Sequence, residues 1–215
     1  NLKGINVSPD NTKMAFSVDT KSRRKYKLYI KDLLDNSILK INISNTNGLS
    51  VWANDSQHLY YVKKDELTLR SDSVYLLDIK NINKKDNLIY FEIDDTFSVS
   101  ISKSKSNKYI FISSHSTKTT EYQYLNSDFP KQKFKLIQKR ITGLEYDVYH
   151  YDKFFFIITN SLSALKRPSI LFKASTQLLN EPCPGKITLS LDLIFSKSEF
   201  TLIFILSLAT SWKEL

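Results

Sequence analysis

The chain has 215 residues, enough for one ordinary domain or for part of a larger one. Hydrophobic residues make up 41% of it and charged residues 25%, a composition that excludes a disordered protein. Its four glycines are far apart, which excludes glycine-rich phosphate-binding loops, because such loops need clustered glycines: Gly4, Gly48, Gly143 and Gly185. The net charge is +9, but only five of the 31 basic residues are arginines and the lysines are spread along the chain, so we expect no nucleic-acid partner.

The chain begins with Asn1, and no basic segment followed by an apolar one comes after it. We therefore expect no secretory signal and interpret the start as internal, with upstream sequence missing. The single cysteine, Cys183, excludes an internal disulfide and lies between Pro182 and Pro184 in a predicted loop. Because nothing near it favours the thiolate, we do not expect it to be reactive, and we expect a cytoplasmic protein.

One sequence pattern occurs three times along the chain. A small residue opens each copy, Asp or Ser follows two positions later, and mostly polar positions precede an apolar triplet: Ser8–Phe16 (SPDNTKMAF), Ala53–Tyr61 (ANDSQHLYY) and Ser104–Ile112 (SKSNKYIFI). The triplets begin at Met14, Leu59 and Ile110, about 45 to 51 residues apart, and a weaker fourth copy starts at Tyr149 (YHYDKFFFI). The openings are typical of tight turns in which Asp or Ser side chains bond to nearby backbone amides.

Each copy is followed by a second segment that is typical of a strand. These segments begin at Tyr26 (YKLYIKDL), Ser73 (SVYLLDIK), Glu121 (EYQYLNSD) and Ser169 (SILFKAS). β-Branched and aromatic residues dominate them, which suits a half-buried pleated surface. No stretch shows the sustained apolar spacing of a helix, so we expect an all-β protein with few helices.

A strand-rich unit that repeats every ~40–50 residues is typical of a β-propeller. We expect each triplet to lie on an inner strand and to pack against the neighbouring blade. Four copies predict about four blades, and because rings usually close with about four to eight blades, we expect a partial β-propeller, an arc of a larger ring. An arc leaves strand edges open to water.

The most apolar segment lies near the end of the chain. Phe200–Trp212 (FTLIFILSLATSW) is shorter than the ~17–25 residues that a membrane-spanning helix needs, and charged residues flank it on both sides. We therefore expect no membrane anchor and interpret the segment as a buried strand pair or a misplaced apolar tail. It is an aggregation hazard if it is exposed.

Several segments resemble one known family. Ser8–Leu33, Val51–Leu69, Asp86–Ile112 and Glu145–Asn160 are similar, in order and nearly without gaps, to the propeller of the oligopeptidase B (protease II) group in the prolyl oligopeptidase family of serine peptidases. Short matches at Ser22–Lys25, Val51–Asp55 and Asp94–Phe97 contribute to the similarity. The resemblance implies a seven-bladed propeller that restricts entry to an α/β-hydrolase domain with a Ser-Asp-His triad. It also implies cleavage of short peptides after Lys or Arg.

The chain departs from that family pattern in several respects. No G-x-S-x-G motif occurs, so the sequence lacks the nucleophile elbow of the hydrolase domain, and the segment that precedes the propeller is also missing. The similarity ends at Ser175, and only Trp212–Leu215 (WKEL) again resembles the family. We therefore divide the chain into a partial propeller, residues 1–175, and an unmatched insertion or frameshifted tail, residues 176–215.

The three histidines, His58, His115 and His150, are the candidates for a general base. His150 has Asp147 and Asp152 nearby in sequence. A Ser-His-Asp triad, however, needs an activated serine within hydrogen-bond reach of the base, and nothing in this spacing supplies one. We therefore expect turn or surface histidines and no catalytic residue.

Two charged clusters have a structural and a functional interpretation. Glu92, Asp94 and Asp95 could bind calcium or act in acid–base chemistry, but their place between two apolar strands predicts a turn. Attraction of basic peptides at the propeller mouth is the alternative. The basic run Ser22–Lys25 predicts a solvated loop, with Arg–carboxylate pairing to another blade or to a hydrolase domain as the second interpretation. We expect no metal site and no cofactor.

These observations predict part of the propeller gate of an oligopeptidase-B-like serine peptidase, inactive alone. Activity would require a separate α/β-hydrolase catalytic chain, and the resemblance implies short basic peptides as substrates. One alternative is a propeller scaffold that binds other proteins, and another is a remnant of a decayed peptidase gene. The missing triad and the unmatched tail favour the peptidase part or the remnant.

Overall fold

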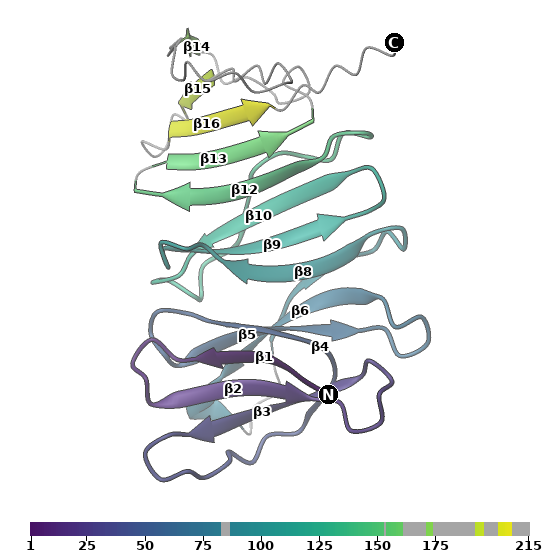
Figure 1. The fold of residues 1–215 in the computed structure, drawn as a ribbon, viewed down its shortest axis with the longest axis vertical. Coiled ribbons are helices and arrows are strands. Elements are labelled where there is room, and N and C mark those ends of the chain that lie inside the picture. Colours follow the sequence, from purple (N-terminus) through teal and green to yellow (C-terminus); the bar gives the residue numbers. More distant parts are fainter. Residues whose placement is uncertain (83–86, 153, 161–170, 174–191, 196–201, 208–215) are drawn as a thin grey trace, which may run out of the picture. The chain divides into compact units, whose positions relative to one another are not determined.

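The structure is a computed structural model that describes residues 1–82, 87–152, 154–160, 171–173, 192–195 and 202–207. The chain divides into two compact units, Asn1–Ser116 with Gln123–Leu136, and Thr117–Tyr122 with Ile137–Leu215. Figure 1 labels most of their strands. The only helix within the described residues is a short 3₁₀ turn, η1 (Ile79–Asn81), so the all-β prediction is confirmed. No helix in this part of the chain is long and apolar enough to cross a membrane.

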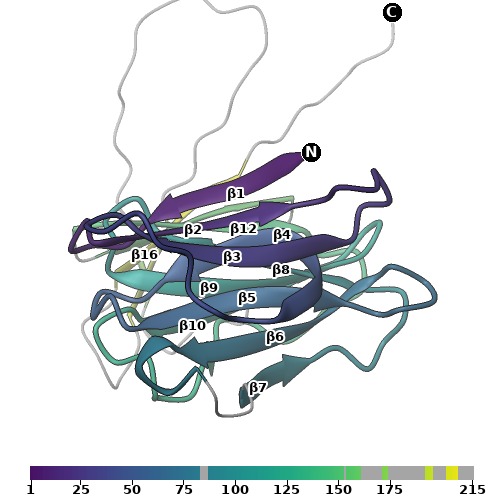
Figure 2. The ribbon, with the colours of Figure 1, turned by 90° about the horizontal axis from the view of Figure 1, so that it is seen from below.

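The larger sheet of the first unit is an antiparallel meander whose strands follow one another in chain order. Its strands are β1 (Leu2–Val7), β2 (Lys13–Val18), β3 (Tyr26–Asp32), β4 (Ile43–Trp52), β5 (His58–Lys64), β6 (Ser71–Asp78) and β7 (Asn87–Phe91). The first and last of these strands, labelled β1 and β7, lie at the two edges of the sheet (Figure 2). A second meander contains β8 (Ser98–Lys103), β9 (Tyr109–His115), β10 (Thr120–Asn126) and β11 (Lys135–Leu136). The start of β10 is assigned to the second unit.

The long strand β4 belongs to two groups of four strands. Its first half pairs with β3 and its second half with β5. The register with β5 shifts between Thr46 and Ser50, around Gly48, whose φ is +89°. The strands therefore form three four-stranded meanders, which we call the first blade (β1–β4), the second blade (β4–β7) and the third blade (β8–β11). This strand order is the one that propeller blades have.

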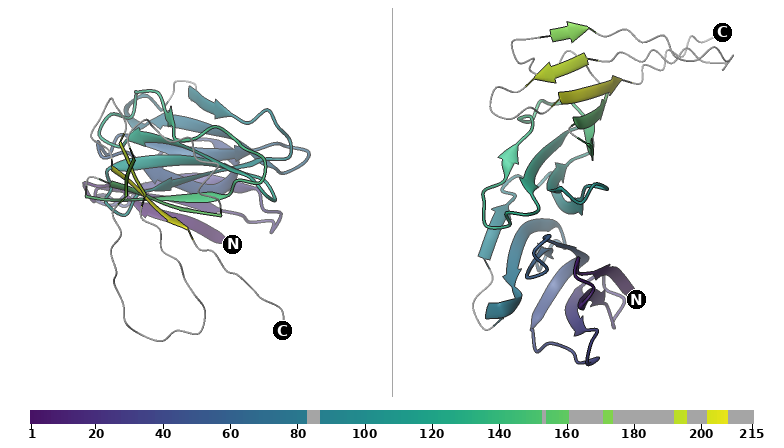
Figure 3. Two further views of the ribbon diagram at one scale, coloured as in Figure 1. Left: turned by 90° about the horizontal axis from the view of Figure 1, so that it is seen from above. Right: turned by 90° about the vertical axis from the view of Figure 1, so that its left-hand side faces the viewer.

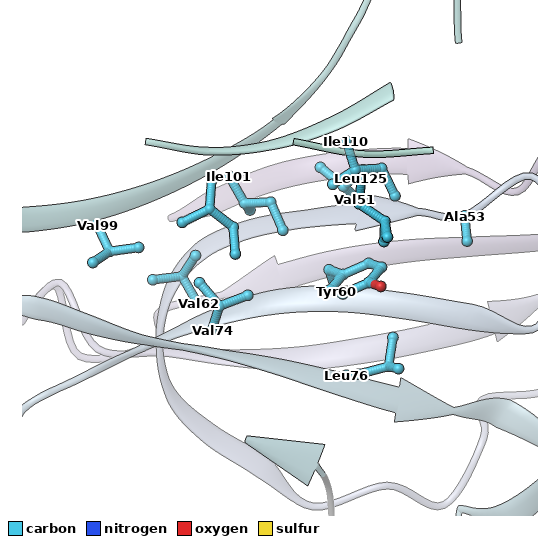
Figure 4. Packing of buried hydrophobic residues seen from close by; sticks show 11 residues of the cluster. Val51, Ala53, Tyr60, Val62, Val74, Leu76, Val99, Ile101, Ile110 and Leu125 are labelled. Carbon is cyan, nitrogen blue, oxygen red and sulfur yellow. The ribbon is translucent and has the colours of Figure 1, made fainter. Parts of the chain in front are cut away.

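The second blade is covered on both faces because alternate side chains of β5 point to opposite sides. Tyr60 and Val62 belong to an apolar cluster shared with β8, β9 and β10 of the third blade (Figure 4). Leu59 and Tyr61 belong to a cluster shared with β2 and β3 of the first blade. All four side chains are fully buried. The predicted packing of the triplet against neighbouring blades is confirmed.

The three repeated openings form the same turn. In each, the amide of the small opening residue donates to the carbonyl five positions later: Ser8 to Lys13 at 2.8 Å, Ala53 to His58 at 2.9 Å, and Ser104 to Tyr109 at 2.8 Å. A residue with positive φ closes each turn: Asn11 at 58°, Ser56 at 56° and Asn107 at 60°. The side chain at the third position accepts a backbone amide in all three copies, from Thr12 to Asp10, from Gln57 to Asp55 and, at 3.4 Å, from Lys108 to Ser106. The predicted turn chemistry is confirmed.

The second unit starts as the fourth copy predicts and then departs from a meander. β12 (Tyr146–Tyr151) and β13 (Phe154–Thr159) form an antiparallel hairpin. β13 then pairs in parallel with β16 (Leu202–Ser207), followed by β15 (Asp192–Phe195) and β14 (Leu171–Lys173) (Figure 3). The segment predicted to follow the triplet is thus present as β14, but at the far edge of the sheet. β16 has six residues and β14 three, so β16 gives β13 the longer hydrogen-bonded ladder.

The unmatched tail is described only in part. Within Phe200–Trp212 the structure describes one strand, β16, which pairs in an antiparallel way with β15, a strand upstream of this segment. The interpretation of the segment itself as a buried strand pair stays a prediction. Cys183 and Trp212–Leu215 lie outside the described residues.

Candidate functional site

A cavity of about 650 Å³ lies within the first unit, where the first strands of the three blades run side by side. β1 and its turn, the second half of β4, and the end of β8 with its turn form the wall. The lining residues are Asn6, Val7, Ser8, Pro9, Asn11, Leu49, Ser50, Val51, Trp52, Asn54, Ile101, Ser102, Lys103, Ser104 and Asn107. The repeated turns therefore bring equivalent positions of three blades to one place.

Side-chain hydrogen bonds tie the wall of this cavity together where β1 and β4 are not paired. Asn6 Nδ2 donates to the Ser50 carbonyl at 2.7 Å, and Trp52 Nε1 donates to the Asn6 carbonyl at 3.1 Å. Between the second and third blades, Asn54 Nδ2 donates to the Asn107 carbonyl at 3.1 Å and to Asp128 Oδ1 at 2.7 Å. These bonds fix the relative position of the three strand ends.

Lys103 is the one charged residue among those that line the cavity. Its partial burial is the main influence on the pKa of its ammonium, which lies below the ordinary value, while the carboxylates of Asp128 and Asp55 act in the opposite direction. Lys103 forms no ion pair with any described residue, so no carboxylate oxygen among them lies within 4.0 Å of its Nζ. Lys103 thus lines the cavity as a partly buried cation without a contacting carboxylate.

A second hollow of about 460 Å³ lies beside the turn of the second blade. Asp55, His58 and Asp128 contribute to its lining, with Phe129 and Lys131. His58 is buried, and its Nδ1 lies 2.6 Å from Asp55 Oδ2. The pKa of Asp55 lies below its usual value. Burial alone would raise this pKa, but hydrogen bonds from the amide of Gln57 and from His58 outweigh the effect of burial.

The predicted histidines play separate structural parts. His58 joins the turn at Asp55 to β6, where Asp78 Oδ2 lies 4.0 Å from its Nε2. His115 is exposed at the end of β9. His150 is buried on β12 and packs edge-on against Phe155, with 5.3 Å between the ring centroids.

The carboxylates that flank His150 in sequence do not complete a triad with it. Burial alternates along β12, so exposed Asp147 points to the face opposite to buried His150. Asp147 Oδ1 accepts a hydrogen bond from the Tyr122 hydroxyl at 2.9 Å. Asp152 takes a φ of 52° in the turn between β12 and β13. Because Asp147 points away from His150, it cannot orient this histidine as the acid of a triad does.

The acidic cluster forms a turn, as predicted. Glu92 is buried and accepts hydrogen bonds from the Tyr90 hydroxyl at 2.7 Å and the Asp94 amide at 3.1 Å. Asp94 Oδ1 in turn accepts from the amide and hydroxyl of Thr96. Asp95 is exposed. Within the described residues no group of three or more His, Cys, Asp or Glu side chains could hold a metal ion.

Arg70, which sequence reasoning missed, fixes the turn that the acidic cluster forms. Its guanidinium donates to the carbonyls of Glu92, Asp94 and Phe97 at 2.8 to 3.2 Å. It therefore binds backbone oxygens instead of the neighbouring carboxylates. No local signal in the sequence identifies such a contact, because Arg70 is more than twenty positions away from its acceptors.

The basic run Ser22–Lys25 forms an exposed loop, as predicted. Its backbone is held by Asp19, whose carboxylate accepts the amides of Lys21 at 3.0 Å and Arg24 at 2.7 Å. Lys64 Nζ donates to the Arg24 carbonyl at 2.9 Å. Lys25 Nζ donates to the Glu66 carbonyl at 3.0 Å. The alternative of Arg–carboxylate pairing to another blade or to a hydrolase domain stays a prediction.

Lys103 was also missed, although the repeat contains a signal for it. Counted from the opening of each turn, Lys103 is equivalent to Val7 and Trp52. Two apolar residues and one lysine at the same repeat position show that the third blade places a charge where the others place apolar groups.

Comparisons with known proteins show where this architecture occurs. Residues 1–175 match the sequence profile of "Prolyl oligopeptidase, N-terminal beta-propeller domain". Protease 2 of Moraxella lacunata is 31% identical over 156 residues, 72% of this chain and 22% of that protein. Dipeptidyl aminopeptidase BI of Pseudoxanthomonas mexicana is 32% identical over 161 residues, 75% of this chain and 22% of that protein. The chain therefore spans about a fifth of the length of these relatives.

Solved structures agree with the sequence relatives. The structure of oligopeptidase B from Leishmania major superposes with a TM-score of 0.67 and 28% identity, covering 75% of this chain and 23% of that chain. Oligopeptidase B from Trypanosoma brucei superposes with a TM-score of 0.64 over 92% of this chain and 31% of that chain. Its identity of 18% makes this second match a likeness of fold alone.

Proposed function

The chain belongs to the prolyl oligopeptidase family, whose N-terminal β-propeller domain its residues 1–175 match, and on this premise we propose that it is part of the gate of a peptidase that cleaves short peptides after Lys or Arg. The profile match over most of the chain is the observation that carries the proposal. The relatives named Protease 2 and oligopeptidase B support the peptidase class. The preference for Lys or Arg rests on the resemblance of the propeller segments to the oligopeptidase B group.

The chain alone is inactive in this proposal. An acyl-transfer mechanism on an α/β-hydrolase needs a serine exposed on a strand-to-helix turn of the G-x-S-x-G type, together with a histidine base and an acid that orients it. The 215 residues contain no such motif. We propose that the nucleophile lies outside these 215 residues, in an α/β-hydrolase part that is the partner of this propeller segment. We propose the cytoplasm as its location, because a single cysteine suits a reducing compartment.

Local charge supports basic peptides as substrates even though the chain carries a net charge of +9. Screening limits the reach of surface charges to about 8 Å at physiological ionic strength, so the groups nearest to a peptide decide its path. Asp55 and Asp128 both line the hollow beside the turn of the second blade. A Lys or Arg side chain that enters there meets two carboxylates and one ammonium, that of Lys131.

The test uses the chain with and without a catalytic part. We expect no hydrolysis of a short Arg-containing reporter peptide by the chain alone. Adding the product of an adjacent reading frame that encodes G-x-S-x-G should give cleavage after Arg and Lys, blocked by a serine-directed reagent, and little cleavage after Ala or Pro. Cleavage by the chain alone, or restored activity without preference for basic residues, would contradict the proposal.

The amino end of the reporter provides a further discrimination. One relative is named a dipeptidyl aminopeptidase. Each reporter is therefore tested with a free and with a blocked amino terminus. The oligopeptidase proposed here should cleave both forms, whereas release of dipeptides requires the free amine.

A further inference from the structure

We propose that the cavity between β1, β4 and β8 binds a carboxylate of a peptide, in the first place its C-terminal carboxylate, with the Lys103 ammonium as the counter-ion. The inference rests on the proposed function, since it names the part of a peptide that the gate holds. It concerns binding alone and includes no chemical step.

The composition of the wall defines the class of ligand. One lysine is the sole charged residue, serines and asparagines provide neutral polar groups, and Leu49, Val51, Trp52 and Ile101 provide apolar surface. Among the described residues no carboxylate lines the cavity, so its wall does not favour cations. A single ammonium without arginine suits a monoanion better than a phosphate, which guanidinium groups bind with paired hydrogen bonds. A peptide end, with one carboxylate and a polar backbone, fits this combination.

The nearest carboxylates do not neutralise the lysine. Asp55 and Asp128 influence Lys103 electrostatically, yet neither forms an ion pair with it within the described residues. The Asp128 carboxylate is occupied by the amide of Asn54 at 2.7 Å, and Asp55 by His58 at 2.6 Å. A partly buried ammonium without a contacting anion is costly, and a bound carboxylate would offset that cost.

Two further observations support a ligand in this place. The volume of about 650 Å³ lies within the range of roughly 300–1,000 Å³ that small-molecule sites have. Ser50, also in the wall, is 3% exposed, and its Oγ has no hydrogen-bond partner in the described part of the chain. Because buried hydroxyls are normally paired, Ser50 Oγ is an unpaired polar group of a residue in the wall.

The experiment compares trialanine as the free acid with trialanine amide, both titrated into the full 215-residue chain by calorimetry. Fluorescence of Trp52, isolated by a Trp212→Phe background, reports on the cavity wall itself. A charge-assisted hydrogen bond is worth roughly tenfold or more in affinity, so we expect the acid to bind about tenfold or more tightly than the amide. A doubly capped tripeptide with a central glutamate distinguishes a side-chain carboxylate from a terminal one.

Variants assign the discrimination to one side chain. Lys103→Met should reduce the ratio of acid to amide affinity to about one, while Lys103→Arg retains it. Lys105→Met is the matched control, because Lys105 is exposed in the same turn and does not line the cavity. Circular dichroism checks folding, and Lys103→Gln replaces Lys103→Met if the latter does not fold.

Several results would overturn the assignment. Equal affinity for acid and amide in the wild-type chain does so without any variant, and so does the absence of binding at about 10 mM peptide, a concentration that detects millimolar dissociation constants. If Lys103→Met still binds the acid more tightly than the amide, the peptide carboxylate binds at a place other than Lys103. Tighter binding of the capped glutamate peptide than of trialanine transfers the site from chain ends to acidic side chains. Binding is measured without cleavage, so a failure here and a failure of the peptidase proposal are distinguishable.

Discussion

Replacing Gly4 by alanine should weaken the first blade more than the same change at another glycine. Gly4 has a φ of +63°, a backbone conformation that costs a residue with a Cβ about 1–2 kcal/mol. A Cβ at this position would also lie 1.9 Å from the carbonyl oxygen of Gly48 and 3.1 Å from its carbon. Both atoms are backbone, so β1 or β4 must shift, and overpacking of this kind costs typically about 1–3 kcal/mol. The sum is a loss of about 2–5 kcal/mol.

β1 has a way to avoid this clash, which limits the loss. It is the edge strand of its sheet, with Leu2, Ile5 and Val7 largely exposed, and β4 touches it through the bonds of Asn6 with Ser50 and Trp52. If the free energy of separating β1 from β4 is smaller than that of the clash, β1 detaches and the rest of the unit stays folded. Hydrogen exchange of the β1 amides, measured beside urea unfolding, detects either outcome.

Two other glycines provide the scale. Gly143 has a φ of +85° and no atom within 4 Å of an added Cβ, so Gly143→Ala measures backbone strain alone, about 1–2 kcal/mol. Gly48→Ala adds a contact at 2.8 Å with Cδ of Lys3, a side chain that can turn away. With a urea dependence of about 1–3 kcal/mol per molar, the predicted order of lost stability is resolvable: Gly4, then Gly48, then Gly143. If Gly4→Ala loses no more than Gly143→Ala and β1 keeps its protection, the close approach of β1 to β4 is refuted.

Three further changes test contacts on which the fold depends. The hydrogen bond from Ser8 is the main cause that lowers the pKa of Asp10 from 3.8 to about 2. The ionised carboxylate therefore stabilises the fold above about pH 4, and this stabilisation is lost as the pH falls through about 2. Because this carboxylate is largely exposed, thermal unfolding should show Asp10→Asn to be at most about 1 kcal/mol less stable at pH 7, and the difference should disappear as the pH falls below about 2. Tyr60→Phe removes a buried bond of 2.5 Å to the Pro130 carbonyl and should cost about 1–2 kcal/mol in urea unfolding; an unchanged midpoint contradicts the bond. Arg70→Lys should expose the turn before β8 to proteolysis, whereas Arg23→Lys, at an exposed site, should not; equal cleavage of the two variants argues against the clamp.

The turns are the part of the structure that sequence reasoning predicts best. Asp10 and Asp55 bond to amides two positions later, and such contacts depend only on neighbouring residues. The apolar triplets are equally local, because alternation along β5 alone places Tyr60 and Tyr61 on opposite faces. A pattern that repeats in sequence therefore predicts a unit that repeats in space.

The cavity could not be predicted in the same way. Its wall combines Asn6, Ser50 and Lys103, which come from three blades and share no local pattern. The sequence contained a cue, since Val7 and Trp52 occupy the repeat position of Lys103. That cue identifies an unusual residue, but only the packing of the three strands shows that a cavity lies in front of it.

The second unit shows where repetition ceases to determine pairing. Repetition predicts a partner for β13 immediately downstream, in the segment that begins at Ser169. The observed partner is β16, in parallel and with Phe154 opposite Leu202. A turn of a few residues allows only an antiparallel neighbour. After a long connection any strand can pair, and we expect the strand that forms the longest ladder of hydrogen bonds to be the partner. Register in the first three blades is thus set by short turns such as the one at Asp10, and where that constraint ends, ladder length decides which strands meet.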